Sequence, residues 1–432
     1  MPEFLTLLPP DDARNLLLSH LSTPKIDSES IDVPSALNRI LAEDILASQP
    51  LPDFQRTTVD GYAVRAGDTH GASDSLPAYL TLIGEVPMGD APEFEIGASQ
   101  CALIHTGGML PNGADAVVML EYTQTIVGAE HRSAPTQTEI EIFRAVATRE
   151  NVIRIGEDVA QGQLVLPKGT LIRPAEIGGL MALGITALRV AKRVSVGLIS
   201  TGDEVIEPSQ TPRPGQVRDI NSFTLGALVE KSGGVAKRYG IISDQFQALK
   251  DAAAQALSEC DVVIITAGSS ASTRDMTAEV IRSLGEPGVL VHGINTRPGK
   301  PTILGVCNGK AVIGLPGNPV SALVNGYLFV VPVIEKLLGE SAKPKATVQA
   351  TLTVNLPSQA GREDWIPVRL IVNRKSKTLA PGASAGVVNY DADPIFGKSN
   401  LIFTLASADG LLRIHPDATG LSAGETVEVV LF

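Results

Sequence analysis

The feature that most constrains the fold is a regular alternation of apolar and helix-forming segments between residues 193 and 336. Four short apolar segments are typical of strands, and each is followed by a polar turn and a stretch typical of a helix. The expected strands span 194–200, 236–242, 261–266 and 311–315, and the expected helices span 221–231, 246–257, 277–284 and 320–329. This alternation indicates a parallel sheet with helical crossovers. In such sheets, ligands bind at the carboxyl ends of the strands.

The segments on either side of this unit have different patterns of apolar and turn-forming residues. Before it, Asp11 and Asp12 precede one helical pattern, and apolar residues at helical spacing predict a second helix over 34–47. Short strand-like segments then alternate with Gly, Pro and Asn-Gly turns, which predicts a small all-β domain. These segments span 79–83, 100–104, 116–120 and 139–142. After the α/β unit, strand-like segments at 346–354, 368–372 and 426–431 predict a compact β domain or barrel.

Composition excludes several classes of function. The 432 residues are 44% hydrophobic, enough for folded cores. Lys and Arg number 35 against 47 Asp and Glu, and the net charge of −12 argues against a general nucleic-acid binder. The three cysteines form no CxxC pair, so neither a thiolate metal site nor a disulfide framework is expected.

No secretory signal or membrane span is apparent. The longest conspicuous apolar run near the end of the chain, 327–334, is interrupted by Pro332. We therefore expect a soluble, cytoplasmic protein without membrane contact.

Polar loops follow the strands of the expected sheet. They are Ser200-Thr201-Gly202-Asp203-Glu204, Asp244, residues 268–275 and residues 314–322. Each has a plain alternative as a turn or a helix cap. Glu204, Asp244 and Asp275 together form a plausible oxygen-ligand set for Mg²⁺ beside phosphates. Asn318 before Pro319 predicts a helix start, whose unpaired backbone N–H groups would suit an anion.

A stiff basic loop, Arg297-Pro298-Gly299-Lys300-Pro301, lies between the last two of these segments. In an acidic protein, two cations held rigid by prolines are a candidate oxyanion clamp. A solvated basic turn is an equally open interpretation. The residues by themselves thus indicate an α/β domain that binds a phosphorylated small molecule together with a divalent metal.

The motifs of the whole chain, taken in order, resemble one family. They are Ala36–Asp44, Leu51-Pro52, Val59–Ala63, Thr106–Gly108, Gly113–Val118, Arg154 with Gly156–Asp158, Ser200–Glu204, Pro298–Pro301, Leu315–Ala322, Gly361-Arg362 and Ala408–Leu411. The ordered set is similar to that of the molybdopterin molybdenumtransferases (MoeA, and the E domain of gephyrin).

The resemblance implies a multidomain α/β plus β fold whose central domain is like the molybdopterin adenylyltransferases. The implied parts are an elongated, discontinuous helical linker domain (1–45 and 147–177), an inserted β domain (46–146), an α/β molybdopterin-binding domain (178–336) and a C-terminal β-barrel-like domain (345–432).

The resemblance also implies a reaction. Such enzymes insert molybdate into adenylylated molybdopterin, release AMP and yield molybdenum cofactor, with Mg²⁺ as the usual metal. They form homodimers, in which the cleft lies between the α/β and C-terminal domains of one subunit and the β domain of the other. Molybdopterin adenylyltransferase and cofactor-accepting apoenzymes are further expected partners.

Residue roles follow from the matched motifs. The implied catalytic residues are Asp60, Glu204, Asp244, Asp275 and Lys300, of which Glu204, Asp244 and Asp275 would hold the metal. The implied contacts to molybdate and molybdopterin-AMP are Thr106, Arg154, Ser269, Ser270, Arg297, Lys300, Pro316, Asn318, Pro319, Ser321, Arg362 and Ser399. Asp60 would reach the cleft of the neighbouring subunit.

Several motifs depart from the family pattern. Arg297 stands where many members have lysine, residues 269–274 replace a commoner Gly-Val-Ser loop, and residues 363–367 lose a second family arginine. These departures leave open a preference for tungstate or a paralogue of altered activity. Two other functions stay open: a molybdopterin adenylyltransferase, disfavoured by the extra β domains, and a non-catalytic molybdopterin-binding scaffold, disfavoured by the retained acidic residues and Lys300.

Overall fold

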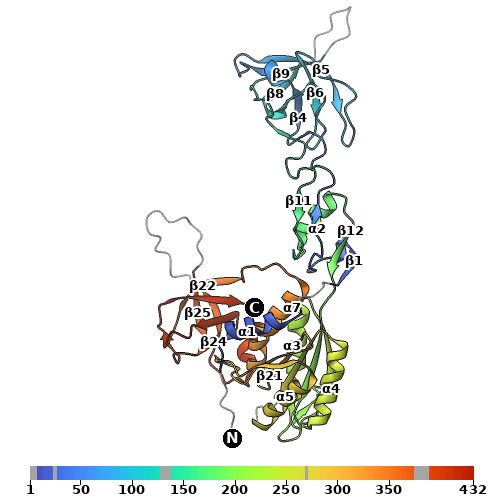
Figure 1. Ribbon diagram of the computed structural model, residues 1–432. Helices are drawn as coiled ribbons and strands as arrows, with labels where there is room; N and C mark the ends of the chain where they lie inside the picture. Colours follow the sequence, from blue (N-terminus) through green and yellow to red (C-terminus); the bar gives the residue numbers. More distant parts are fainter. Residues whose placement is uncertain (1–6, 23–26, 127–137, 268–270, 374–388) are drawn as a thin grey trace, which may run out of the picture.

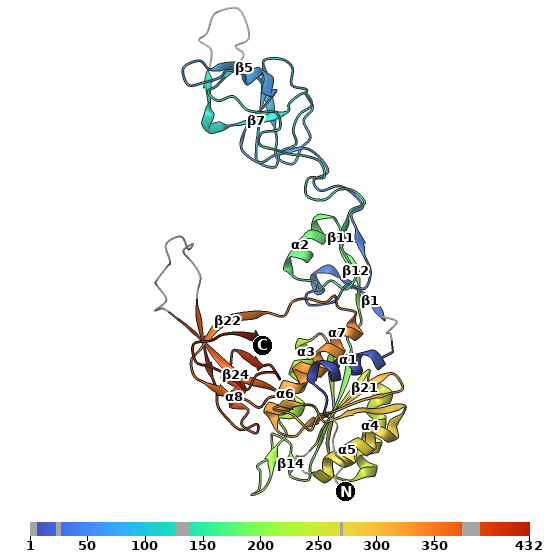
Figure 2. The same ribbon diagram turned by 60° about the vertical axis from the view of Figure 1, so that its left-hand side comes forward.

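The computed structural model describes residues 7–22, 27–126, 138–267, 271–373 and 389–432. The molecule is elongated (Figure 1): a β domain lies far from a larger base, and a narrow linker joins the two. The base contains an α/β domain and a C-terminal barrel, which lie side by side in both views (Figures 1 and 2). The chain runs out from the base to the distal domain and back again.

A six-stranded sheet forms the distal domain. Its strand order is β7 (Ala116–Met119), β4 (Gly61–Val64), β6 (Gln100–Ile104), β5 (Ala78–Val86), β9 (Glu139–Ile142) and β8 (Thr123–Ile126). Two short 3₁₀ turns, η2 (Ala66–Thr69) and η3 (Leu120–Tyr122), connect its strands. Successive residues of β4 point to opposite faces, so Tyr62 and Val64 pack in one apolar cluster while Ala63 packs in another. The four strands expected in this region are confirmed.

Three short antiparallel pairs form the linker. They are β1 (Ser28–Asp32) with β12 (Ala187–Ala191), β2 (Ile45–Leu46) with β11 (Leu164–Leu166), and β3 (Arg56–Thr57) with β10 (Val152–Ile153). Helix α2 (Pro174–Ala182) and the 3₁₀ turn η1 (Val33–Ser35) complete its small core. The predicted domain limits remain a prediction. However, β12 pairs with the linker strand β1, although it lies within the predicted α/β range.

The helix expected over 34–47 is wrong. The segment instead contains the turn η1 and the short strand β2, and Asn38 adopts a positive φ of 61° that no α-helix contains. The backbone bonds instead to the returning chain: the Leu41 N–H donates to the Thr170 carbonyl and the Ala42 N–H to the Arg189 carbonyl. The spacing of apolar residues therefore arises from burial against a segment that is distant in the sequence. The same spacing would also be found on one face of a helix.

The sheet of the α/β domain has six strands. Their order is β16 (Val235–Ile242), β13 (Ser195–Thr201), β17 (Val262–Ala267), β21 (Lys310–Pro316), β20 (Ile303–Cys307) and β18 (Pro287–His292). The first four are parallel, as expected. Strands β20 and β18 run antiparallel to their neighbours at one edge and were not predicted. A small pair, β14 (Val205–Ile206) with β15 (Val217–Arg218), follows β13.

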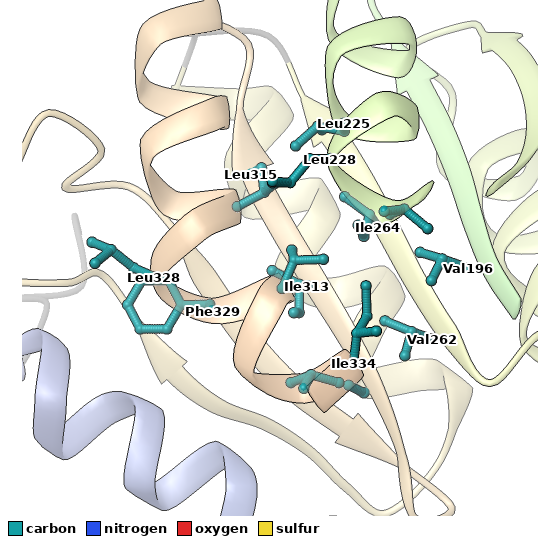
Figure 3. Close-up of a cluster of buried hydrophobic side chains, with 14 of the residues drawn as sticks. Val196, Leu225, Leu228, Val262, Ile264, Ile313, Leu315, Leu328, Phe329 and Ile334 are labelled. Atoms are coloured by element: carbon teal, nitrogen blue, oxygen red, sulfur yellow. The ribbon is translucent and has the colours of Figure 1, made fainter. Parts of the chain in front are cut away.

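Helices cover both faces of this sheet. They are α1 (Pro10–His20), α3 (Asn221–Lys231), α4 (Phe246–Glu259), α5 (Ala271–Leu284), α6 (Pro319–Asn325), the π-helical segment η4 (Gly326–Val330) and α7 (Val331–Leu338). One face packs against α1, α3, α6 and α7, and the other against α4 and α5. Figure 3 shows part of the first cluster, where Val262, Ile264 and Ile313 lie against side chains of α3 and α7.

The helical stretch Pro319–Leu338 is longer than expected. It has the length and mean hydropathy, 1.5, of a membrane-crossing helix, yet 61% of its most apolar window is buried inside the protein. Pro332 does not end this stretch. It lies in the first turn of α7, where the missing backbone N–H of a proline is tolerated. The stretch is a central helix of the core.

The C-terminal domain is a closed barrel. The strand order is β19 (Thr296–Arg297), β24 (Glu363–Val372), β25 (Tyr390–Pro394), β22 (Thr347–Leu352), β28 (Thr426–Leu431) and β26 (Gly410–Ile414), and pairing of β24 with β26 closes it. A short pair, β23 (Leu356–Pro357) with β27 (Gly420–Leu421), and helix α8 (Phe403–Ala406) complete the domain. The expected barrel is confirmed, and its first strand, β19, belongs to the basic loop of the α/β domain.

Candidate active site

A cleft of about 1020 Å³ lies between the α/β domain and the barrel. Loops after β18 and β21 form one wall, and barrel segments around residues 356–367 and 395–404 form the other. Seven residues predicted to bind substrate line it: Arg297, Lys300, Pro316, Asn318, Ser321, Arg362 and Ser399. The structure therefore brings together residues that lie on four separate segments of the sequence.

Backbone pairing fixes the two walls to one another. Strands β19 and β24 run parallel, with Thr296 opposite Glu363 and Arg297 opposite Asp364. The Thr296 hydroxyl also donates to the Glu363 carbonyl at 3.1 Å. At the other wall, the Val320 N–H donates to the Ser399 carbonyl at 3.0 Å. The relative position of the basic loop and the barrel is thus set by hydrogen bonds of the main chain.

Asp364 organises the two arginines of the cleft. Its side chain is only 2% exposed, and it accepts from Arg362 Nε at 2.7 Å and Arg362 Nη2 at 3.0 Å. Ser358 Oγ donates to the same carboxylate at 3.0 Å, and Arg297 Nη1 lies 3.8 Å from it. Sequence reasoning missed Asp364. Its signal was an acid two residues after Arg362, a spacing that places both side chains on one face of an extended segment.

Lys398 adds a cation that sequence reasoning also missed. It lines the cleft immediately before Ser399. Among the described residues, the lining thus contains the four cations Arg297, Lys300, Arg362 and Lys398 and one carboxylate, that of Asp364. This excess of positive charge occurs in a chain whose net charge is −12. The cleft therefore concentrates positive charge in an otherwise acidic protein, which is the charge that an anionic ligand requires.

The basic loop is held by close contact with α6. Asn325 Nδ2 donates to the Pro298 carbonyl at 3.1 Å and to the Ser321 carbonyl at 2.8 Å. Gly299 has a φ of 106°, and a Cβ there would lie 1.7 Å from Asn325 Nδ2. Only glycine fits this position, which explains how Arg297 and Lys300 come to flank a sharp turn.

The start of α6 is confirmed, but its predicted chemistry is partly wrong. Pro319 occupies the first turn, as expected, and it is buried. The Asn318 side chain makes no capping hydrogen bond and lines the cleft instead. The Val320 N–H is not available to an anion, because it already binds Ser399.

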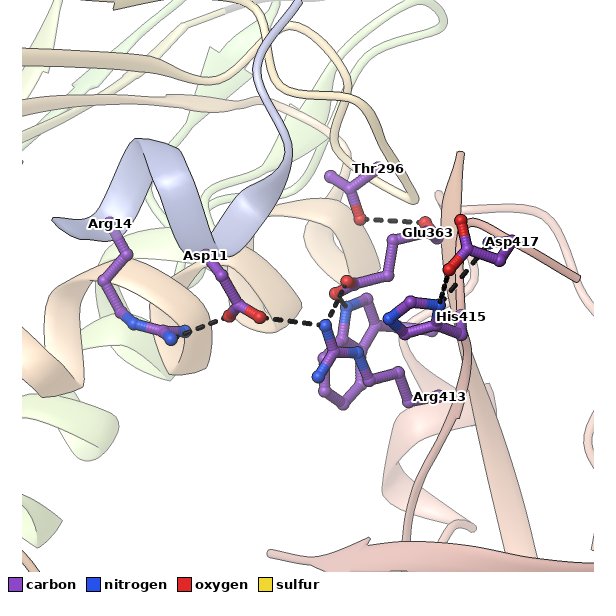
Figure 4. Close-up of polar contacts among 8 residues, drawn as sticks. Asp11, Arg14, Thr296, Glu363, Arg413, His415 and Asp417 are labelled. Carbon is purple, nitrogen blue, oxygen red and sulfur yellow. Dashed lines mark hydrogen bonds and ion pairs between the residues drawn. The ribbon is translucent and has the colours of Figure 1, made fainter. Parts of the chain in front are cut away.

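An ion-pair network beside the cleft joins the two domains (Figure 4). Arg413 Nη2 of β26 donates to Glu363 Oε2 at 2.6 Å and to Asp11 Oδ2 of α1 at 3.0 Å. Trp365 Nε1 donates to the other oxygen of Glu363 at 2.6 Å. Burial raises the pKa of Asp11, but the contacts with Arg413 and Arg14 outweigh it and lower that pKa overall. We call these residues, Asp11, Arg413, Glu363 and Trp365, the Arg413 network.

Glu204 and Asp244 lie at the carboxyl ends of neighbouring strands, as predicted. The Asp244 N–H donates to Asp203 Oδ1 at 3.3 Å. Burial, followed by the charges of Asp203 and Glu204, raises the pKa of Asp244. Asp244 Oδ1 is buried and has no hydrogen bond of standard geometry with the described residues, although the Thr201 hydroxyl partly offsets the rise of this pKa. A hard cation would satisfy this crowded set of oxygens, so the donor chemistry fits Mg²⁺.

No preformed metal cage is present among the residues that the structure describes. No three Asp, Glu, His or Cys side chains there gather around a common point. Asp275 is exposed in the first turns of α5. Ser269 and Ser270 lie outside the described residues.

Asp60 and Thr106 come together in the distal domain, far from the cleft of the same chain (Figure 1). The backbone N–H and the hydroxyl of Thr106 donate to Asp60 Oδ1 at 2.7 and 3.1 Å, and this lowers the pKa of Asp60. His105 lies between Asp60, at 3.9 Å, and Glu85, at 3.0 Å. Arg154 pairs with Glu157 at 3.2 Å. All these side chains are at least partly exposed, and one chain alone does not bring them to the cleft.

Three family models match the chain in succession. The MoeA N-terminal region (domain I and II) matches residues 8–184, a probable molybdopterin binding domain matches 197–336, and the MoeA C-terminal region (domain IV) matches 349–432. The order agrees with that of the linker and distal domain, the α/β domain and the barrel.

Full-length relatives cover nearly the whole chain. A putative molybdopterin biosynthesis protein of Methanocaldococcus jannaschii is 37% identical over 98% of both chains. The molybdopterin molybdenumtransferase of Haemophilus influenzae is 33% identical, also over 98% of both. The solved structure of a molybdopterin biosynthesis MoeA protein from Pyrococcus horikoshii matches 99% of this chain and 100% of its own, with a TM-score of 0.82 and 32% identity.

Proposed function

The chain belongs to the MoeA family of molybdopterin molybdenumtransferases, and on that premise we propose that it inserts molybdenum from molybdate into adenylylated molybdopterin and releases AMP. Membership makes it a transferase of molybdenum cofactor biosynthesis. The details of the reaction, its metal and its subunit arrangement are the proposal.

The observation that carries the proposal is the charge of the cleft. Its described lining contains four cations, Arg297, Lys300, Arg362 and Lys398, and one carboxylate, that of Asp364. Molybdate is a tetrahedral dianion, and the adenylylated pterin carries phosphate groups, so both substrates need placed cations. Guanidinium groups match the geometry of oxyanions, and lysines add point charge. A basic cleft in an acidic protein also concentrates anionic substrates.

Mg²⁺ is the proposed metal, held by Asp244 with Glu204 and Asp275. Its support is the buried, unpartnered Oδ1 of Asp244 and the crowding of that group by Asp203 and Glu204. Mg²⁺ usually takes one or two carboxylates and completes its shell with waters and substrate phosphates, so no cage is needed before substrate binds. The bound ion would neutralise charge on the phosphates as the adenylate bond breaks.

A homodimer is proposed because one chain leaves the site incomplete. Asp60 and Thr106 are exposed in the distal domain, and Arg154 is exposed directly after the linker strand β10. The linker separates the distal domain from the cleft of the same chain (Figure 2). A second copy would bring its distal domain to that cleft. Mixing Asp60→Asn with Lys300→Ala protein tests this. Dimers with one defect on each chain keep one intact site, so recovered activity supports sharing, and no recovery after subunit exchange contradicts it.

The reaction is tested by supplying adenylylated molybdopterin, Mg²⁺ and either molybdate or tungstate. AMP release and active cofactor, scored by reconstituting a molybdenum-free apoenzyme, are followed together. Lys300→Ala and Asp275→Asn are expected to abolish most activity, whereas Lys343→Ala, which removes a surface cation paired with Glu340, serves as the matched control. Molybdate-dependent AMP release supports insertion, and its response to tungstate gives the oxyanion preference.

Other outcomes would replace this proposal. Consumption of ATP with free molybdopterin would indicate an adenylyltransferase, and tight binding of the adenylate without AMP release would indicate a scaffold. A cytoplasmic location, with molybdopterin adenylyltransferase and cofactor-accepting apoenzymes as partners, belongs to the same proposal. The location is supported by three cysteines that are all free.

A further inference from the structure

We propose that Asp364 is a positioning residue of the oxyanion site, which acts by holding Arg362 so that one edge of its guanidinium faces the ligand. The proposal rests on the proposed function for the identity of the ligand, a tetrahedral oxyanion of molybdate type. Asp364 lies in the cleft lining, yet its side chain is almost completely buried, at 2% exposure.

The pairing of Asp364 with Arg362 uses one edge of the guanidinium. The carboxylate accepts from Nε and Nη2, which form the side-on edge. Among the residues that the structure describes, Nη1 makes only a long contact of 3.5 Å to Gln359 Oε1. The end-on edge, formed by the outer hydrogens of Nη1 and Nη2, is therefore left for an anion. A bidentate pair of this kind fixes the plane of the arginine as well as its position.

Asp364 also lies at the joint between the two walls. The register of β19 with β24 places Arg297 of the α/β domain directly opposite it, and Arg297 Nη1 lies 3.8 Å from its carboxylate. Ser358 Oγ fixes the carboxylate from the barrel side at 3.0 Å. One buried acid thus contacts a cation from each wall, and the spacing of the two cations depends on it.

Two effects of removing this carboxylate have opposite signs. The cleft becomes more positive, which by itself strengthens binding of a dianion. Arg362 loses its bidentate partner and is repelled by Arg297, which weakens binding by releasing the guanidinium from its orientation. The proposal predicts that the second effect prevails, because an unfixed arginine must be ordered again each time an anion binds.

The test is calorimetric titration of the full-length protein with molybdate, without the pterin. Asp364→Asn is expected to raise the dissociation constant about tenfold, the lower end of the loss seen when the partners that orient metal ligands are removed. In the AMP-release assay, the KM for molybdate should rise in parallel while kcat changes little. Glu363→Gln is the matched control, since it removes an equally buried charge from the adjacent position, on the Arg413 network. It should lower stability and leave molybdate affinity unchanged.

The outcomes separate this inference from the proposed function. Unchanged or tighter molybdate binding by Asp364→Asn overturns the positioning role, because it leaves only charge neutralisation. Equal losses of affinity in Asp364→Asn and Glu363→Gln overturn it too, since they indicate general disruption. Wild-type protein that binds molybdate but never releases AMP contradicts the reaction and leaves the positioning role standing.

A second variant keeps the proposal testable if Asp364→Asn does not fold. Asp364→Glu keeps the charge and moves the carboxylate by one methylene group. Weaker molybdate binding is expected, because the pairing with Arg362 depends on position as well as charge. Wild-type affinity in this variant would overturn the proposal.

Discussion

The Arg413 network gives the sharpest stability prediction. Arg413→Met removes the ion pairs to Glu363 and Asp11 while keeping apolar bulk against the ring of Trp365, which lies 5.7 Å from the guanidinium. Glu363 is 2% exposed and then retains Trp365 Nε1 as its side-chain donor among the described residues. A buried carboxylate thereby loses its counter-charge, at the place where the barrel meets α1.

The size of the effect follows from the burial of the two partners. Removing one partner of a fully buried ion pair costs about 3–5 kcal/mol. Arg413 is 36% exposed, so water screens part of the interaction. We therefore expect about 2 kcal/mol. With a urea slope of about 2 kcal/mol per molar, the midpoint of unfolding should fall by about 1 M.

The assay is urea unfolding followed by tryptophan fluorescence. Trp365 is the only tryptophan of the chain, and it belongs to the network, so the signal reports this junction. Glu363→Gln and the double variant complete a cycle with Arg413→Met. If the residues act as a pair, the double variant loses less stability than the sum of the single variants. Strictly additive losses, or a midpoint within about 0.2 M of wild type for Arg413→Met, would show that this ion pair does not stabilise the junction.

Three further perturbations test other parts of the structure. Gly299→Ala should lower the free energy of unfolding by about 1–3 kcal/mol and raise the KM for molybdate, because the new Cβ would clash with Asn325. A melting temperature and a KM equal to those of wild type would contradict this. Asp244→Asn should raise the melting temperature of the metal-free protein, because it relieves the repulsion of Asp244 by Asp203 and Glu204. AMP release should fall about 10–100-fold. A lower melting temperature with full activity would count against a metal site at Asp244. The hydrogen bond from Arg173 lowers the pKa of Glu176 to about 2. The ionised Glu176 therefore contributes its full share of folding stability above the unfolded pKa of 4.5, and this contribution is lost as the pH falls toward 2. Acid unfolding of Glu176→Gln should differ from wild type above that window and converge with it below, and a constant difference would be inconsistent with the lowered pKa.

Local sequence pattern was sufficient for elements buried on both faces. Strand β17 is buried throughout because helices cover it on both sides, and its apolar run 262–265 could be recognised from composition alone. The hairpin of β20 and β21 was missed, although Asn308-Gly309 between them is a strong turn signal. The segment 34–47 could not be predicted locally, since its hydrogen-bond partners lie far away in the sequence.

The candidate site depended on family resemblance more than on pattern. Lys300, Arg362 and Ser399 come from separate segments, and no spacing in the sequence indicates that they share a cleft. Asp364 and Lys398 were visible as charges next to motif residues. Their roles depend on the register of β19 with β24 and on burial, which are tertiary properties.

We propose that the cleft couples insertion of molybdenum to release of AMP. The most direct measurement quantifies AMP and pterin-bound molybdenum in the same single-turnover reaction, with wild type and Arg362→Met compared at subsaturating molybdate. We expect equal amounts of both products from wild type and a joint loss of both in the variant. AMP release at the wild-type rate without molybdate, or in the variant, would contradict it.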